Sequence, residues 1–261
     1  MNISLAAEPI FHIGSFPVTN TLMVSWVVLA ALVVLSVAVR RSMRVVPAGI
    51  HNAAEAVIEF LLNMVDGVTN DREKTKRFFP VIATIFIAVV ASNWIELVPG
   101  LGSIGFYEMK DGVRELVPFI RSSSADLNFT AAIALVSFFS VQAFGMMSLG
   151  VGQYLGKFFV WPWKKPYVIG SFVGILELIG EFSKIISFSF RLFGNIFAGE
   201  VLLLVVGSLV PYLVPLPFLG LEIFVGVVQA LVFSMLTLVF MTIATAAHGE
   251  GEGPHAPAGV H

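Results

Sequence analysis

The apolar run from Ser171 to Val210 carries one arginine, Arg191, near its middle. A cation at membrane depth costs about 3 kcal/mol on insertion scales and more than about 10 kcal/mol in simulations. A chain that keeps an arginine there must fold so that the guanidinium meets a partner. Arg191 is therefore the first candidate for a functional residue.

The composition indicates a polytopic membrane protein. The chain has 261 residues, of which 57% are hydrophobic and 12% charged, and its mean hydropathy is +0.91. Soluble domains are about 25% charged, so most of this chain faces lipid or other apolar protein. The net charge of −2 argues against nucleic acid as a partner. The absence of cysteine excludes disulfides, thiol nucleophiles and Cys-based metal sites.

Several apolar segments reach the length of about 20 residues that one membrane crossing needs. We expect an all-α membrane domain over 1–261, with membrane helices at 21–39, 78–98, 127–149, 171–210 and 218–247. Between the first two, 48–70 has apolar residues at helical spacing with acids among them. This pattern predicts an amphipathic helix on the membrane surface, and an ordinary soluble connector is the alternative. We expect 100–127 to be an external loop and 249–261 a disordered tail.

Basic residues in the loops predict the orientation of the chain. Residues 40–77 carry seven Lys or Arg and 150–170 carry three, whereas 1–20 carry none. Cytoplasmic loops are the ones enriched in Lys and Arg. We therefore expect the N-terminus outside and both basic stretches in the cytoplasm. Five crossings would place the C-terminus in the cytoplasm as well.

The fourth segment, 171–210, is too long for an ordinary crossing. About 40 residues make a helix of about 60 Å, whereas the hydrocarbon core is about 30 Å thick. Either the segment is two helices with a hidden turn, or it is one steeply tilted helix. No proline interrupts it, which favours one helix. Simple hydrophobic mismatch does not explain such a tilt, but a large convex partner beside this segment and 218–247 would.

A helical projection of the fourth segment places polar and small residues on the side of Arg191. At 100° per residue, Lys184 and Ala198 lie about 20° from Arg191. Glu177 and Asn195 lie about 40° from it. Small residues let another helix approach closely within a membrane. This projection predicts a face, centred on Arg191, that receives a neighbouring helix.

Two polar routes follow from the same projection. One is built from Glu177, Glu181 and Lys184, and the other from Glu200, Glu222, Gln229 and Asn195. Glu200 falls about 180° from Arg191, so we expect it to face the fifth segment. Chains of carboxylates within membrane segments are a common form of proton pathway. For the first group, simple pairing between side chains is an equally open interpretation, since Glu181 and Lys184 are three residues apart.

The block RLFGNIFAGE at 191–200, followed after a proline-rich turn by LEIFVGVVQALVFSMLTLVF, closely resembles the stator a subunit of F-type ATP synthases. ELIGEFSKIISFSF and NWIELVPG, both upstream, fit the same family. The resemblance implies one peripheral transmembrane helix, a surface helix, a transmembrane pair and two long, strongly tilted helices around a rotor ring. It also implies a bacterial plasma membrane location and no cofactor or metal. The implied partners are the rotor c-ring and peripheral-stalk b subunits.

The resemblance also implies roles for individual residues. The family's essential arginine falls on Arg191, and its asparagine, glutamate and glutamine fall on Asn195, Glu200 and Gln229. Where some relatives carry histidine, this chain has Glu222. The implied mechanism brings protons in past these acids and amides to the rotor. The protons leave near Glu177 and Glu181, and Arg191 separates the two routes.

Two other classes of protein fit less well. A secondary transporter would show internal repeats and broken membrane helices, and neither is evident here. A membrane-embedded enzyme is not supported, since the chain has no HExxH, GxSxG or GxxxxGK[ST] pattern. We therefore expect it neither to bind nor to hydrolyse ATP itself. The relay-like polar groups favour H⁺ over Na⁺. The roles of Asn93 and Glu96, near the expected outer membrane edge, stay open.

Overall fold

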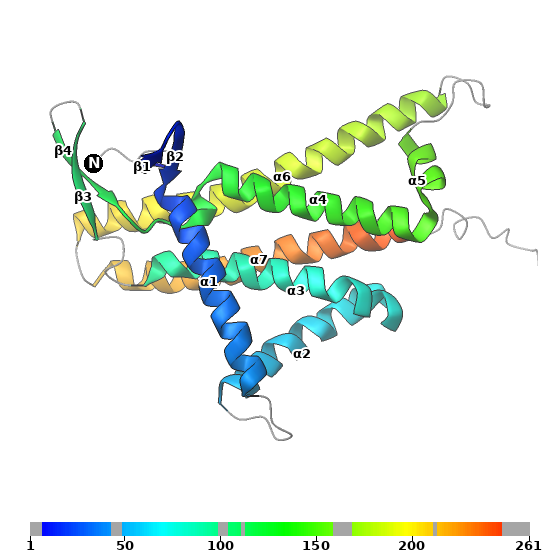
Figure 1. The fold of residues 1–261 in the computed structure, drawn as a ribbon, viewed down its shortest axis with the longest axis horizontal. Helices are drawn as coiled ribbons and strands as arrows, with labels where there is room; N and C mark the ends of the chain where they lie inside the picture. Colours follow the sequence, from blue (N-terminus) through cyan, green and yellow to red (C-terminus); the bar gives the residue numbers. More distant parts are fainter. Residues whose placement is uncertain are drawn as a thin grey trace, which may run out of the picture.

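The computed structural model describes residues 7–42, 49–98, 104–110, 113–158, 169–210 and 213–246. Over these ranges the chain is mainly helical, as expected (Figure 1). Five of the described helices are long and apolar enough to cross a membrane. They are α1 (Asn20–Arg41), α3 (Arg72–Trp94, continued by the 3-10 turn η1, Ile95–Leu97), α4 (Leu127–Leu149), α6 (Ile169–Leu209) and α7 (Pro215–Thr245). The tail expected at 249–261 lies outside the described residues.

Helix α6 is continuous over 41 residues, so the segment contains no hidden turn. It runs beside α4 and α7, and α3 packs against α7 (Figure 1). Phe188 and Leu192 of α6 are buried in one core cluster with Phe233 of α7 and Phe86 of α3. The ring centroids of Phe188 and Phe233 lie 5.0 Å apart. This core fixes which face of α6 points inward.

Helix α2 (Ile50–Thr69) connects α1 to α3 and is amphipathic. Leu61 and Val65 are fully buried, whereas Val57 and Phe60 are exposed. An apolar face that is only partly covered by protein fits the predicted place on a membrane surface. Between α2 and α3, the side chain of Asp71 accepts hydrogen bonds from two backbone amides of the first turn of α3 and caps that helix.

Two small antiparallel hairpins and a short helix were not expected from the sequence. The hairpins pair β1 (Pro9–Ile13) with β2 (Phe16–Thr19), and β3 (Gly105–Lys110) with β4 (Val113–Pro118). The short helix, α5 (Val151–Phe158), follows α4. Both hairpins lie at the end of the bundle where α6 meets α7, and α5 lies at the opposite end (Figure 1). After β4, the chain enters the bundle through the 3-10 turn η3 (Ser123–Ala125).

Candidate functional site

Arg191 lies on an uncovered face of α6. Its side chain is exposed, and Nη2 donates a long hydrogen bond of 3.4 Å to Ser187 Oγ. No carboxylate pairs with it within the described part of the chain. Gly194 and Ala198 are exposed on the same side, and a methyl group at Gly194 would meet nothing within 4 Å. The face that the sequence predicted around Arg191 is therefore open to a partner outside this chain.

Asn195 and Gln229 link α6 to α7. Asn195 Nδ2 donates a hydrogen bond of 2.6 Å to Gln229 Oε1. The other amide atom, Gln229 Nε2, is buried and has no hydrogen-bond partner among the described residues. A buried donor without a partner costs about 1–3 kcal/mol. This amide is therefore a place where a water molecule or a passing polar group would be stabilised.

Glu200 forms a buried ion pair with Arg121, which lies in the loop after β4. Arg121 Nε lies 2.9 Å from Glu200 Oε1. Nε and Nη2 also donate to Glu200 Oε2, at 3.2 Å and 3.1 Å. The two side chains are only 6% and 14% exposed. The sequence predicts that Glu200 faces the fifth membrane segment, and this stays a prediction. The structure adds a cationic partner from the loop after β4, because that loop packs against α6.

Glu222 of α7 packs directly against Gly199 of α6. It is buried, and a methyl group at Gly199 would overlap its carboxyl group. Because Gly199 has no side chain, the carboxyl group of Glu222 can lie directly on the backbone of α6 at this position. Glu222 therefore contacts α6 at Gly199, the residue directly before Glu200.

The end of α3 completes this part of the site. Asn93 Nδ2 donates to the backbone oxygen of Gly226 at 3.0 Å, between Glu222 and Gln229 on α7. Glu96 Oε2 accepts a hydrogen bond of 3.1 Å from the backbone N–H of Ser122, next to Arg121. Asn93 therefore ties α3 to α7. Glu96 belongs to the same polar cluster as the Arg121–Glu200 pair.

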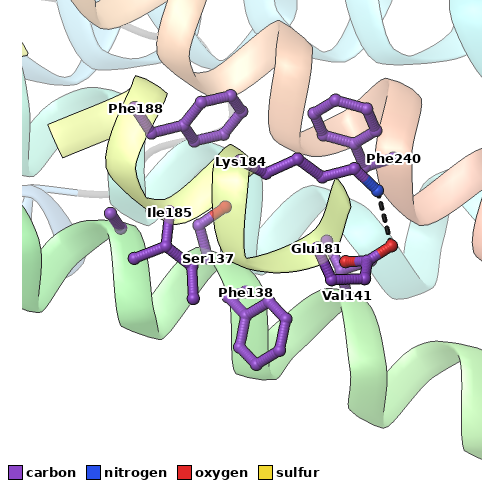
Figure 2. A pocket seen from close by; sticks show the side chains of 9 residues that line it. Ser137, Phe138, Val141, Glu181, Lys184, Ile185, Phe188 and Phe240 are labelled. Atoms are coloured by element: carbon purple, nitrogen blue, oxygen red, sulfur yellow. Dashed lines mark hydrogen bonds and ion pairs between the residues drawn. The ribbon is translucent and has the colours of Figure 1, made fainter. Parts of the chain in front are cut away.

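A second polar cluster surrounds Glu181 and Lys184 on the other side of Arg191 along α6. Lys184 Nζ lies 2.5 Å from Glu181 Oε1, and 4.3 Å from the centre of the Phe240 ring. Both charged residues line a small cavity of about 10 Å³ between α4, α6 and α7, among mostly apolar side chains (Figure 2). A volume of this size is about what one water molecule requires. The ion pair that the sequence left open is therefore present, beside a water-sized space.

Gln142 and Tyr154 extend this cluster away from the cavity. Gln142 Nε2 donates to Glu181 Oε2 at 3.0 Å, and the hydroxyl of Tyr154 donates to Gln142 Oε1 at 2.6 Å. Burial, with a further effect of the carboxylates of Glu181 and Glu177, raises the pKa of Tyr154 to about 12. The phenol therefore stays protonated at neutral pH and keeps its role as a donor.

The sequence reasoning named eight site residues, and the structure places them in three groups. Arg191 lies between two clusters. The first contains Glu200, Glu222, Asn195 and Gln229. The second contains Glu181 and Lys184, and Glu177 lies near it. The reasoning missed Arg121, Gln142 and Tyr154. The only sequence signal for Arg121 was a basic residue directly before the polar stretch SSSAD.

Comparisons with known proteins give one consistent result. Residues 22–242 match the family described as ATP synthase A chain. The chain is 29% identical to ATP synthase subunit a of Moorella thermoacetica over 241 residues, which cover 92% of this chain and 96% of the relative. It is 32% identical to ATP synthase subunit a of Trichlorobacter lovleyi over 241 residues, 92% of each chain. It is 33% identical to that of Geobacter sulfurreducens over 219 residues, 83% of each chain.

Proposed function

The chain belongs to the ATP synthase A chain family, and on that premise we propose that it forms two offset half-channels for protons beside a rotor ring. It is a multi-pass, non-catalytic subunit of the membrane sector of the synthase. We assign the rotor c-ring and the peripheral-stalk b subunits as its partners. We also assign an external N-terminus and a cytoplasmic C-terminus, in a bacterial plasma membrane.

The observation that carries this proposal is the position of Arg191. It lies on an open face without a carboxylate partner in the described chain, between two separate polar clusters. A guanidinium facing lipid would be strongly disfavoured. A carboxylate presented by a neighbouring subunit would remove that cost. The exposed glycine and alanine beyond Arg191 leave room for such a subunit to come close.

The external half-channel is built from the polar residues where α6 meets α7. A proton enters past Glu222 and Glu200, passes Gln229 and Asn195, and neutralises the carboxyl group of a rotor subunit. The neutral rotor site can move into lipid, whereas the ionised one cannot without a large cost. Rotation thus becomes possible only after a proton has bound.

The second half-channel leads to the cytoplasm past Glu181, Lys184 and Glu177. After nearly a full turn, the rotor carboxyl group reaches this side and releases its proton. Arg191 then attracts the ionised rotor site. Because an arginine stays protonated in proteins, it cannot relay a proton between the two routes. A membrane potential supplies about 2.3 kcal/mol per charge per 100 mV, which drives the turn.

The decisive experiment replaces Arg191 by lysine in the complete synthase. We expect Arg191→Lys to abolish proton-driven ATP synthesis in membrane vesicles, because a desolvated lysine can lose its proton and no longer separates the routes. The matched control is Arg72→Lys, at an exposed arginine that pairs with Asp66, and it should retain normal synthesis. Normal synthesis rates in Arg191→Lys, at equal subunit content, would refute the proposal.

A further inference from the structure

The two proposed half-channels do not yet give Arg121 a role. Among the lysine and arginine side chains whose exposure the structure describes, it is the one that is buried, at 5% exposure. Its guanidinium is engaged through two nitrogen atoms with the carboxylate of Glu200. A two-point contact of this kind fixes the plane of the carboxylate as well as its charge. Arg121 therefore controls how Glu200 is presented.

The backbone around Arg121 is held by contacts with two membrane helices. Ser122 Oγ donates to the backbone oxygen of Ser92 on α3 at 3.1 Å, and Ser123 Oγ donates to that of Thr21 on α1 at 3.1 Å. Asp126 accepts a hydrogen bond of 2.7 Å from the hydroxyl of Thr21. The guanidinium is thus held in a fixed place and is not a mobile surface charge.

The surroundings of this cation are strongly acidic. Glu200 of α6 faces it directly. Glu222 of α7 lies against Gly199, the residue before Glu200, and Glu96 lies at the end of α3. Glu8, before β1, and Glu96 both lie close enough to act on the charge of Glu200. Arg121 is a cationic neighbour of both Glu200 and Glu96. Without it, these two carboxyl groups would lie close to each other in a buried place, and repulsion would disfavour charge on both.

We propose that Arg121 is a positioning residue of the external half-channel, which keeps Glu200 ionised and oriented as the acceptor of the entering proton. This inference rests on the proposed function. When a proton reaches Glu200, an O–H bond forms on one carboxylate oxygen and the contact with Arg121 weakens. When the proton moves on, that O–H bond breaks and the ion pair forms again. The loop before η3 is therefore part of the proton pathway, although it lies outside the long helices.

The test compares Arg121→Gln, Arg121→Lys and wild type in the complete synthase, in membrane vesicles. ATP synthesis is measured against the pH of the compartment that the external side faces. Arg121→Gln should lower the rate at neutral pH and move the profile toward alkaline pH by about one unit or more, the size typical of losing an adjacent cation. Arg121→Lys keeps the charge but loses the two-point contact, so it should retain the wild-type profile at a reduced rate. Arg72→Gln, at an exposed ion pair, is the control. It should change neither the rate of ATP synthesis nor its pH profile.

Two outcomes would overturn the inference. One is an unchanged pH profile in Arg121→Gln, whether the rate is normal or uniformly lowered, because a purely structural tie would act equally at every pH. The other is a lysine variant that restores no activity relative to the glutamine variant. If Arg121→Gln does not assemble, Arg121→Lys decides: a wild-type rate would overturn the orienting role. Failure of the proposed function would appear separately, as normal synthesis in Arg191→Lys.

Discussion

The two arginines of the site meet the same physical demand in different ways. A guanidinium removed from water needs an anion or several hydrogen-bond acceptors. Arg121 finds its anion, Glu200, within this chain. Within the described part of the chain, Arg191 is exposed and has a long hydrogen bond to Ser187, and its guanidinium lies 6.0 Å from the centre of the Phe188 ring, but no carboxylate pairs with it. This difference supports the proposal, in which Arg121 acts within this subunit and Arg191 pairs with a charge on another subunit.

Glycine at position 199 is required by the carboxyl group packed against it. In Gly199→Ala, the new methyl group would overlap the carboxyl group of Glu222. The overlapping atoms are the end of a flexible side chain, so we expect a stability loss at the low end of the range of about 1–3 kcal/mol that overpacking causes. Proton-driven synthesis should fall markedly, because Glu222 is displaced. Subunit content and synthesis rates in vesicles measure the two effects.

The control for this variant lies on the same helix. A methyl group at Gly207 would approach only Pro215, at 4.0 Å, which is an ordinary contact. Gly207→Ala should therefore leave both stability and synthesis close to normal. Equal activity in the two alanine variants would contradict the close packing of Glu222 on Gly199.

At the scale of helices, the outer face of α6 should tolerate bulk in the isolated chain but not in the assembled motor. Ala198 is exposed and lies about two turns beyond Arg191. Ala198→Leu should change the stability of the isolated chain by no more than about 0.5 kcal/mol. It should nevertheless strongly reduce ATP synthesis, because a leucine would hold the rotor away from Arg191. Ser208→Leu, at an exposed position about 100° around the helix from Arg191, is the control, and an equal loss there would contradict a rotor-facing role of the Ala198 side.

The side chain of Tyr154 packs α5 against α4. Tyr154 is buried over Gly145, and its pKa is raised to about 12 from the ordinary value of 10.0. Below about pH 10 both the folded and unfolded chains keep this proton. Between pH 10.0 and about 12, the phenol loses its proton in the unfolded chain but keeps it in the folded chain. The free energy of unfolding therefore falls as the pH rises through this range.

Tyr154→Phe should remove this alkaline loss of stability. At neutral pH, the variant should be less stable than wild type by about 0.5–1.5 kcal/mol, because the hydrogen bond to Gln142 is lost. Between about pH 10 and 12, the difference between the two proteins should shrink. Unfolding in detergent, followed at a series of pH values, measures both effects. If the stabilities of the variant and the wild type differ by the same amount over this whole pH range, the pKa of the phenol is not changed by folding, which would contradict the prediction.

The long helices were predictable from the sequence, whereas the contacts between distant segments were not. Apolar length and the absence of proline predicted α6 as one helix. Helical spacing correctly put Arg191 and Ala198 on one exposed face. By contrast, Arg121 and Glu200 are 79 positions apart, and no periodicity relates a loop residue to a helix. The hairpin β3–β4 and helix α5 are too short to give a clear periodic signal.

At the scale of the whole molecule, the two ends of the bundle differ in what they carry. Both hairpins, the end of α6 and the beginning of α7 lie at one end, whereas α5 and the beginning of α6 lie at the other (Figure 1). The Arg121 cluster belongs to the hairpin end, because the loop after β4 supplies it. The Glu181 cluster belongs to the α5 end, because Tyr154 supplies part of it. The two polar clusters therefore lie toward opposite ends of the bundle (Figure 1), which is the arrangement that the proposed half-channels need.

The predicted orientation can be tested because the chain has no cysteine. Ser15→Cys introduces a single thiol at an exposed position in the turn between β1 and β2, and Lys76→Cys introduces one on the exposed side of α3 near its start. Since basic stretches stay in the cytoplasm, a membrane-impermeant maleimide should label Ser15→Cys in right-side-out vesicles and Lys76→Cys only in inverted ones. Both variants should label after detergent is added, which controls for buried thiols. The reverse labelling pattern would mean that the chain has the opposite orientation in the membrane. The Arg121 cluster would then belong to the cytoplasmic route and the Glu181 cluster to the external one.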